Sequence, residues 1–340
     1  MEPIRVGIIN VTGYIGGDLA RLLHQHPDVS LVSVTGRSAA GEKLGTVFPH
    51  MAGVDLEITS ELGEVDLAFS ALPHAAGAEV IARTLEKEIR VIDISADFRL
   101  NSPEVYKEWY KVDHPVPELL EEAVYGLPEI NRSEITRARL IANPGCYPTS
   151  AILPLIPALR EGIIEPDIIV DSKSGLSGAG RALTMTTHFA EANESASAYA
   201  LAGHRHMPEI KQELQKVAGG AEVSLTFVPH LVPMTRGMLS SCYAGLKKEI
   251  KPDKVMDIYR EFYRDEPFVR VVDNPPQTKH TLGNNFCLIY PAVDARTGRL
   301  IVISCIDNLV KGGAGQAVQN MNLMLGLPET RGLEQVAIYP

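Results

Sequence analysis

The first 95 residues alternate short apolar runs with stretches in which apolar residues recur every three or four positions. Apolar runs that alternate with helical periods predict βαβ units, which build a parallel sheet covered by helices. The expected elements are strand 5–10, helix 17–24, strand 31–35, strand 65–71, helix 75–87 and strand 91–94. A further strand at 139–142 closes the series, so we predict an α/β, doubly wound parallel sheet.

The pattern changes after about residue 162, where longer strand-like runs predominate. The expected strands are 167–173, 222–228, 237–246, 268–272, 286–293 and 300–306, with helices at 208–217 and 252–262. Long strands with few helices predict an α+β domain with a mainly antiparallel sheet. The pattern at 314–326 predicts an amphipathic helix that follows a Gly-Gly turn.

The segment 143–149 reads Asn-Pro-Gly-Cys-Tyr-Pro-Thr and contains one cysteine, Cys146. The Asn-Pro-Gly turn follows a strand, and Pro148 suits the first turn of a helix that runs to about Arg160. Unpaired N–H groups and the positive end of the helix dipole favour a thiolate at that position, which is the nucleophilic form. The alternative is a buried cysteine beside a tight turn, but the turn and the proline favour a nucleophile.

The other three cysteines are Cys242, Cys287 and Cys305, and each lies in a strand-like apolar run. We expect them in the core. The four cysteines show neither a CxxC pair nor zinc-type spacing.

The turn after the first strand reads Gly-Ile-Ile-Asn-Val-Thr-Gly-Tyr-Ile-Gly-Gly over residues 7–17. Glycines there let the backbone approach a pyrophosphate that rests on the helix N-terminus. Asn10 stands where a glycine is usual, and asparagine tolerates the left-handed conformation. A plain βα turn is the alternative, which the position after the first strand disfavours. The residues expected at a dinucleotide are Thr12, Gly13, Tyr14 and Gly16.

The end of the second predicted strand indicates which dinucleotide is bound. An NAD site usually carries an acidic residue there, bonded to the ribose 2′-hydroxyl. This chain has Arg37 and Ser38 instead, which suit a 2′-phosphate. Unless Arg37 is an ordinary solvated arginine, the site prefers NADP(H).

Composition narrows the class of protein. Hydrophobic residues make up 45% of the 340 residues and charged residues 22%, as in globular proteins. A formal charge of −10 argues against a nucleic-acid partner but allows a local pocket for a small anion. No apolar run approaches the roughly 20 residues that span a bilayer, and the N-terminal residues do not resemble a signal peptide. We therefore expect a cytoplasmic protein without a membrane partner.

Three other segments contain groups that bind anions or move protons. Segment 171–181 combines glycines, hydroxyls and two cations, as in an anion cradle, although a mobile Gly/Ser loop has the same composition. Segment 203–210 places His204 and His206 just before a helix, and segment 95–99 follows a strand. Histidine titrates in the range useful to a thiol nucleophile. A metal site on the two histidines and Cys146 is disfavoured, because no further ligands stand at suitable spacing.

These segments together resemble the N-acetyl-γ-glutamyl-phosphate reductases, the NADPH-dependent enzymes of arginine biosynthesis, over nearly the whole chain. The matching segments are 13–16, 36–41, 93–100, 143–149, 173–180, 204–210 and 307–312. Asn10 departs from the glycine usual in the family. The resemblance implies a Rossmann-type NADP-binding domain at 1–147, an α+β catalytic and dimerisation domain at 148–313, as in semialdehyde dehydrogenases, and a C-terminal helix at 314–340 that returns to the first domain.

The resemblance also implies roles for particular residues. Cys146 is the expected nucleophile and His206 the expected acid/base. Residues expected to bind the substrate or its phosphate are Arg99, Ser174, Gly175 and Arg205. Ser177 and Gly178 are expected to join the cofactor site, and no metal is expected. The implied reaction reduces N-acetyl-L-glutamyl 5-phosphate to the 5-semialdehyde through a cysteine thioester in a homodimer or homotetramer.

Proteins with the same motifs can have other functions. Related enzymes of lysine biosynthesis reduce an aminoadipyl phosphate held on an acidic carrier protein, and the charge of −10 gives no support for such a carrier. Aspartate-semialdehyde dehydrogenases fit the double-histidine segment less well. A catalytically silent NADP(H)-binding regulatory protein would have no reason to keep Cys146 and His206 in intact settings. A simple dehydrogenase would leave the cysteine turn unexplained.

Overall fold

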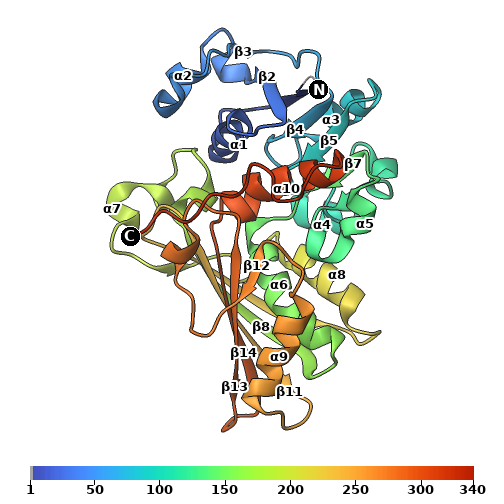
Figure 1. The fold of residues 1–340 in the computed structure, drawn as a ribbon, viewed down its shortest axis with the longest axis vertical. Helices are drawn as coiled ribbons and strands as arrows, with labels where there is room; N and C mark the ends of the chain where they lie inside the picture. The colour runs from blue at the N-terminus through green and yellow to red at the C-terminus, as the bar shows by residue number, and fades with distance from the viewer. Residues whose placement is uncertain (1–2) are drawn as a thin grey trace. The chain divides into compact units, whose positions relative to one another are not determined.

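The computed structural model describes residues 3–340, which fall into two compact units. The first unit comprises residues 1–145 and 313–334, and the second comprises residues 146–312 and 335–340. Each unit is built on its own seven-stranded sheet, and Figure 1 shows the elements of both.

The first unit is a doubly wound parallel sheet with the strand order β3-β2-β1-β4-β5-β7-β6. This confirms the predicted fold class. The strands are β1 (Ile4–Ile9), β2 (Val29–Thr35), β3 (Ile58–Thr59), β4 (Leu67–Ser70), β5 (Arg90–Asp93), β6 (Val124–Tyr125) and β7 (Leu140–Ala142). The helices are α1 (Tyr14–His24), α2 (Leu44–Val47), α3 (Ala78–Leu85), α4 (Pro103–Tyr110), α5 (Pro128–Ile135) and α10 (Gly315–Met324).

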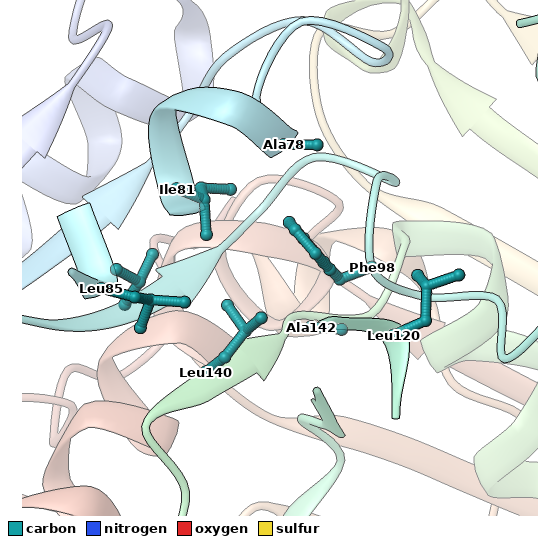
Figure 2. Close-up of a cluster of buried hydrophobic side chains, with 8 residues drawn as sticks. Ala78, Ile81, Leu85, Phe98, Leu120, Leu140 and Ala142 are labelled. Carbon is teal, nitrogen blue, oxygen red and sulfur yellow. The ribbon is translucent and has the colours of Figure 1, made fainter. Parts of the chain in front are cut away.

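The apolar periods of the sequence become a packed core in this unit. Helix α3 directs Ala78, Ile81 and Leu85 onto the sheet, where they meet Leu140 and Ala142 of β7 (Figure 2). Val91 of β5, Phe98 after that strand and Leu120 at the end of a 3₁₀ turn complete the cluster. This packing holds the carboxyl ends of β5 and β7 in place, from which segments 95–99 and 143–149 emerge.

Helix α10 differs from the expected amphipathic helix. Of its ten residues only Leu323 is even partly exposed, and the polar residues Gln316, Gln319, Asn320 and Asn322 are all buried. The polar side of the helix packs on protein rather than water. Asn320, for example, donates to the carbonyl oxygen of Gly126 at 2.9 Å.

The second unit is a mixed sheet with the order β12-β13-β14-β11-β8-β10-β9. Four of its six strand pairs are antiparallel, while β10 lies parallel to β8 and β12 parallel to β13. The strands are β8 (Ile164–Gly175), β9 (Ser197–Ala198), β10 (Ser224–Val232), β11 (Met238–Leu246), β12 (Val269–Val271), β13 (Cys287–Asp294) and β14 (Arg299–Ile306). The helices are α6 (Cys146–Arg160), α7 (Phe189–Ala192), α8 (Met207–Val217) and α9 (Pro252–Phe262).

Helix α6 lies against β8, β11 and β14 and contains two interior prolines. A proline removes the hydrogen bond to the carbonyl four residues earlier. Pro154 thereby frees the carbonyl of Ser150, which accepts a hydrogen bond from the Ser304 hydroxyl at 2.5 Å. Pro157 frees the carbonyl of Leu153, which accepts from the Tyr263 hydroxyl. Neighbouring side chains therefore satisfy the carbonyls that the prolines leave open.

Candidate active site

Cys146 is the first residue of α6, and its side chain is partly exposed. The first N–H groups of a helix have no intrahelical partner, so the thiol lies among donors that stabilise negative charge. The other cysteines are buried, as predicted. Burial raises the pKa of the Cys305 thiol to about 12 and raises that of Cys242 further, which keeps both thiols protonated. Cys146 is therefore the cysteine placed for nucleophilic chemistry.

A π-helical turn at Val310–Ala314 contacts Cys146 from within the same unit through Gly312. A Cβ built on Gly312 would lie 2.8 Å from the Cβ of Cys146 and 3.2 Å from its Cα. Only a residue without a side chain allows this approach. No pattern in the sequence indicates this contact, because it depends on how the folded chain brings Gly312 to Cys146.

His206 precedes α8 and belongs to a cluster of rings in the second unit. The His206 ring lies edge-on to Tyr147 at a centroid distance of 5.9 Å and to His204 at 4.9 Å. Tyr199 and Phe227 complete the cluster around His204, each at 5.5 Å. Since Tyr147 directly follows Cys146, this cluster places the predicted acid/base next to the neighbour of the predicted nucleophile.

The proton positions in this cluster follow from its hydrogen bonds. Nδ1 of His204 accepts from the backbone N–H of His206 at 3.0 Å, so a neutral His204 carries its proton on Nε2. Burial and, secondarily, Arg205 lower the pKa of His204 to about 4, which keeps the ring neutral near pH 7. Nε2 faces the Tyr199 hydroxyl at 3.4 Å, Tyr199 donates to the Tyr147 hydroxyl at 3.1 Å, and Tyr147 donates to the carbonyl of His230 at 3.2 Å.

Sequence reasoning missed Tyr199 and Phe227 in this cluster. Tyr199 follows an exposed segment of small and polar residues, and Phe227 lies in an apolar run that predicts only a strand. Burial raises the pKa of Tyr199 to about 12, so its hydroxyl remains a donor. Arg205, next to the two histidines in sequence, is exposed.

The predicted anion cradle begins at the end of β8 and continues into a short 3₁₀ turn at Leu176–Ala179. Ser174 is buried, and a Cβ on Gly175 would lie 2.8 Å from the carbonyl oxygen of Thr235. Ser177 is also buried and accepts a hydrogen bond from Asn308 Nδ2 at 2.9 Å. A Cβ on Gly178 would lie 2.9 Å from Ser174 Oγ, so this turn is tightly packed rather than a loose loop.

In the first unit, the turn between β1 and α1 has Asn10 where dinucleotide-binding turns usually have a glycine, and it keeps the backbone conformation of such a turn. Asn10 has φ of 67°, the left-handed conformation that a glycine would otherwise supply. Its Nδ2 donates to the carbonyl of Ala71 at 2.8 Å, which anchors the turn to the end of β4. A Cβ on Gly16 would lie 2.4 Å from the carbonyl oxygen of Val11, whereas one on Gly13 would meet nothing within 4 Å. The helix N-terminus thus has open space at Gly13, with Thr12 partly buried and Tyr14 exposed beside it.

Arg37 and Ser38 begin a short 3₁₀ turn after β2, and both are exposed. They line a groove of about 990 Å³ together with Asn10, Thr35 and Gly36. Arg37 makes no ion pair with any carboxylate in the described part of the chain, so its charge is available to an anion. The groove and the unpaired arginine fit the adenosine and 2′-phosphate of NADP(H).

Arg99 lies in the first unit and is only 4% exposed. Its Nε donates to the carbonyl of Asn143 and one Nη donates to the carbonyl of Ile94, both at 2.8 Å. The guanidinium therefore links the ends of β5 and β7.

Two classes of feature are absent from the described structure. Within residues 3–340, no group of three or more His, Cys, Asp or Glu side chains is arranged to hold a metal ion. The helices over the same residues are all too short or too polar to cross a bilayer.

Comparison with known proteins matches both units to one family. The semialdehyde dehydrogenase NAD binding domain matches residues 5–138, and the semialdehyde dehydrogenase dimerisation domain matches residues 146–308. A protein of Dehalococcoides mccartyi called N-acetyl-gamma-glutamyl-phosphate reductase is 60% identical over the full length of both chains. The chain belongs to the N-acetyl-gamma-glutamyl-phosphate reductase family. A reductase of the same name from Heliobacterium modesticaldum is 48% identical over 99% of this chain and 100% of its own.

Comparison with solved structures shows that this chain has the semialdehyde dehydrogenase fold. Aspartate semialdehyde dehydrogenase II of Vibrio cholerae superposes with a TM-score of 0.74 at 17% identity, covering 96% of this chain and 99% of its own. The Candida albicans aspartate semialdehyde dehydrogenase, solved with NADP, gives 0.71 at 15% identity over 95% and 99% of the two chains. At these identities the likeness concerns the fold alone.

Proposed function

We propose that this chain catalyses the NADPH-dependent reduction of N-acetyl-L-glutamyl 5-phosphate to N-acetyl-L-glutamate 5-semialdehyde, with release of phosphate, in arginine biosynthesis. The observation that carries the proposal is the full-length identity of 60% to a reductase of that name. The partly exposed Cys146 at the start of α6 supports it, because an acyl phosphate needs a thiolate to accept the acyl group. A biosynthetic reaction of this kind favours a cytoplasmic location.

The first half of the reaction forms a thioester. The Cys146 thiolate attacks the acyl carbon, a C–S bond forms, and the bond from that carbon to the phosphate oxygen breaks. We assign the stabilisation of the oxyanion that develops on the acyl oxygen to backbone N–H groups in the first turn of α6. We assign the phosphate to the cations and the glycine-rich turn that the resemblance singles out, namely Arg99, Ser174, Gly175 and Arg205.

The second half releases the aldehyde. Bound NADPH supplies the hydride that reduces the thioester carbon. We assign to His206 the proton that the resulting oxyanion takes up and returns when the C–S bond breaks and the Cys146 thiolate re-forms. The neutral His204 accepts the backbone N–H of His206 through Nδ1, and this contact supports a positioning role for His204.

The first unit contains the residues that we assign to the cofactor. Gly13 leaves open space at the α1 N-terminus for the pyrophosphate, with Thr12, Tyr14 and Gly16 around it. We assign the 2′-phosphate to Arg37 and Ser38, and this fits the groove that both residues line. The resemblance adds Ser177 and Gly178 to this set.

The match of residues 146–308 to a dimerisation domain indicates an oligomer. We propose a homodimer, or a homotetramer built from it, that pairs through the open face of the second sheet. Helices α6, α8 and α9 cover the other face. Across the open face, strand register aligns a largely apolar row in which each member is at least partly exposed: Thr226, Ile169, Tyr243, Ile301 and Ala292. A second copy of the chain is the occupant that would bury it.

The reverse reaction provides the test. NADP⁺ reduction is measured with N-acetylglutamate semialdehyde, with and without phosphate, for the wild type and Cys146→Ser. We expect phosphate-dependent activity that the substitution abolishes, while NADPH binding persists. Activity without phosphate would contradict the acyl-phosphate reaction, and an active Cys146→Ser variant would contradict the thioester. If the wild type binds NADPH but stays inactive, the carrier-bound aminoadipyl substrate should be assayed next.

A further inference from the structure

A buried carboxylate that the proposed mechanism does not use lies directly after β14, in the second unit. Asp307 is 0% exposed, and backbone N–H groups of three other residues donate to its side chain. Oδ1 accepts from Leu309 at 2.8 Å and from Val310 at 3.2 Å, while Oδ2 accepts from Gly283 at 2.8 Å. Oδ2 also lies 3.7 Å from Nη1 of Arg236. Burying a carboxylate is costly unless donors and a cation compensate it, and this site supplies both.

The main chain of Asp307 holds the turn that contacts Cys146. Its carbonyl accepts a hydrogen bond at 2.9 Å from the N–H of Gly312, five residues later, which is the spacing of a π-helix. Gly312 is the residue whose lack of a side chain allows the turn to approach the Cβ of Cys146. Turns of this kind are rare and occur frequently at functional sites. Asp307 therefore binds this turn twice, through its carbonyl at Gly312 and through its carboxylate at residues 309 and 310.

The other carboxylate oxygen determines where the turn lies. Gly283 follows a 3₁₀ turn at Thr278–Thr281, and Arg236 lies between β10 and β11. Both belong to the second unit, as Cys146 does. Through Oδ2, Asp307 therefore ties the turn beside Cys146 to two segments that are far from it in sequence. The carboxylate both closes the turn and anchors it.

The next residue connects to the glycine-rich turn. Asn308 is 1% exposed, and its Oδ1 accepts from the N–H of Gly237 at 2.8 Å while its Nδ2 donates to Ser177 at 2.9 Å. The carbonyl of Gly237 in turn accepts from the N–H of Gly175 at 2.9 Å. Two consecutive side chains therefore join the turn beside Cys146 to the turn that we assign to the phosphate and the cofactor.

Resting on the proposed reaction, we propose that Asp307 is a positioning residue for Cys146, acting through Gly312, and that Asn308 positions the glycine-rich turn. During thioester formation, the sulfur and the departing phosphate are bonded to the same acyl carbon, so the two turns must keep a fixed separation. A displacement of about 1 Å can cost on the order of 10²-fold in rate. The peptide bond between Asp307 and Asn308 maintains that separation, because it links the two anchoring side chains directly.

Asp307→Asn tests the carboxylate. The amide keeps one acceptor oxygen for the turn, but its N–H₂ group then faces the donors of Gly283 and Arg236, so the anchor is lost. We expect kcat of the phosphate-dependent reaction to fall at least about tenfold, while KM for NADP⁺ stays within about twofold. Iodoacetamide should alkylate Cys146 at least about threefold faster, because the unanchored turn no longer covers the thiol. Wild-type values of kcat and alkylation in a folded variant would overturn the proposal.

Asp294→Asn is the matched control, because Asp294 makes contacts of the same kind elsewhere in the unit. Its Oδ1 accepts from the backbone N–H of Arg296 at 3.0 Å, and its carboxylate pairs with the Arg296 side chain. Asp294 lies opposite Arg299, the first residue of β14, whereas Asp307 follows the last residue of that strand. The two carboxylates are thus at opposite ends of β14, and the control should keep kcat and alkylation within about twofold of the wild type.

The position of the label separates positioning from a general loss of stability. The other three cysteines are buried, so partial unfolding would expose them together with Cys146. Mass spectrometry of the alkylated protein should find faster labelling at Cys146 alone. Faster labelling of all four cysteines would show that Asp307 only stabilises the fold, which would overturn the proposal.

A double-mutant cycle tests the route through Gly312. If Asp307→Asn and Gly312→Ala displace the same turn, their effects should not add, and the double variant should have a kcat within about threefold of the slower single variant. Independent effects, which multiply in kcat, would overturn the proposal. If Asp307→Asn does not fold, Arg236→Met removes one partner of Oδ2 and should change kcat and alkylation in the same directions. Wild-type values in that variant would likewise overturn the proposal.

Asn308→Leu tests the second half of the proposal. The apolar side chain leaves Gly237 and Ser177 without this partner, so KM for phosphate should rise about tenfold while the alkylation rate of Cys146 stays within about twofold. An unchanged KM for phosphate would overturn the role of Asn308. A wild type without phosphate-dependent activity would refute the proposed reaction instead, whereas the alkylation rates, which need no turnover, would still test the placement of Cys146.

Discussion

Replacing Gly312 with alanine would place a methyl group against Cys146, the proposed nucleophile. The added Cβ would lie 2.8 Å from the Cβ of Cys146 and 3.3 Å from Cδ1 of Ile306. Carbon atoms in contact are normally about 3.5–4.0 Å apart, so Cys146 or the turn must move by roughly 0.7 Å or more. Misplacing a reacting group by about 1 Å can cost on the order of 10²-fold in rate. We therefore expect kcat to fall between about 10-fold and 100-fold.

The assay separates this effect from general damage. Steady-state kinetics give kcat and KM, NADPH titration reports on the cofactor site, and the rate of alkylation by iodoacetamide reports on the thiol itself. Gly245→Ala is the control, since a Cβ there would meet its nearest neighbour, Glu165, at an ordinary 3.8 Å. We expect Gly312→Ala to change kcat and alkylation while NADPH affinity stays within about twofold. A Gly312→Ala enzyme with wild-type kcat and alkylation rate would refute the reasoning.

Three further predictions concern proton binding, a helix carbonyl and assembly. Burial lowers the pKa of His204 to about 4, so the contribution of the neutral imidazole to the free energy of unfolding is complete above pH 6.5 and is lost as the pH falls towards 4. His204→Asn should therefore make the free energy of unfolding in urea less dependent on pH between 6.5 and 4. A variant with the same pH dependence as the wild type would contradict this. Tyr263→Phe leaves the Leu153 carbonyl without its donor and should lower the free energy of unfolding by about 1–3 kcal/mol in urea titrations, whereas no change would show that water replaces the hydroxyl. Ile169, 39% exposed, lies on the open sheet face, so Ile169→Glu should shift sedimentation towards monomer, and an intact oligomer would place the interface elsewhere.

The sequence predicted the elements whose periodicity was long enough to recognise. The strands of four or more residues and the helices α1, α3, α6, α8 and α9 lie close to the expected ranges. The strands β3, β6 and β9, each of two residues, were missed because so short a run has no period. Helices α4 and α5 were also missed. Each begins with a proline, which serves equally as a helix start and as a turn signal.

Residues of the candidate site were predictable only where the type of side chain and its position before a helix indicate a chemical role. Cys146 and His206 stood out as a thiol at a helix start and an imidazole before a helix, and Asn10 was expected to adopt the left-handed turn that it has. Neither Tyr199 nor Gly312 has a sequence pattern around it that predicts its contacts. Their contacts depend on tertiary approach, through a hydrogen bond to Tyr147 in one case and the lack of a Cβ in the other.

Helix α10 shows why polar residues in a helical pattern are ambiguous. Gln316, Gln319 and Asn320 suggested a solvent-facing side, because polar side chains usually face water. In the structure all three are buried, and two of them find their hydrogen bonds in protein, Gln319 with Glu329 and Asn320 with Gly126 and Asn143. Gln316 differs from them, because neither of its amide atoms has a hydrogen-bond partner among the described residues. Polarity alone therefore does not show which side of a helix faces water, because protein groups can take the place of water as hydrogen-bond partners.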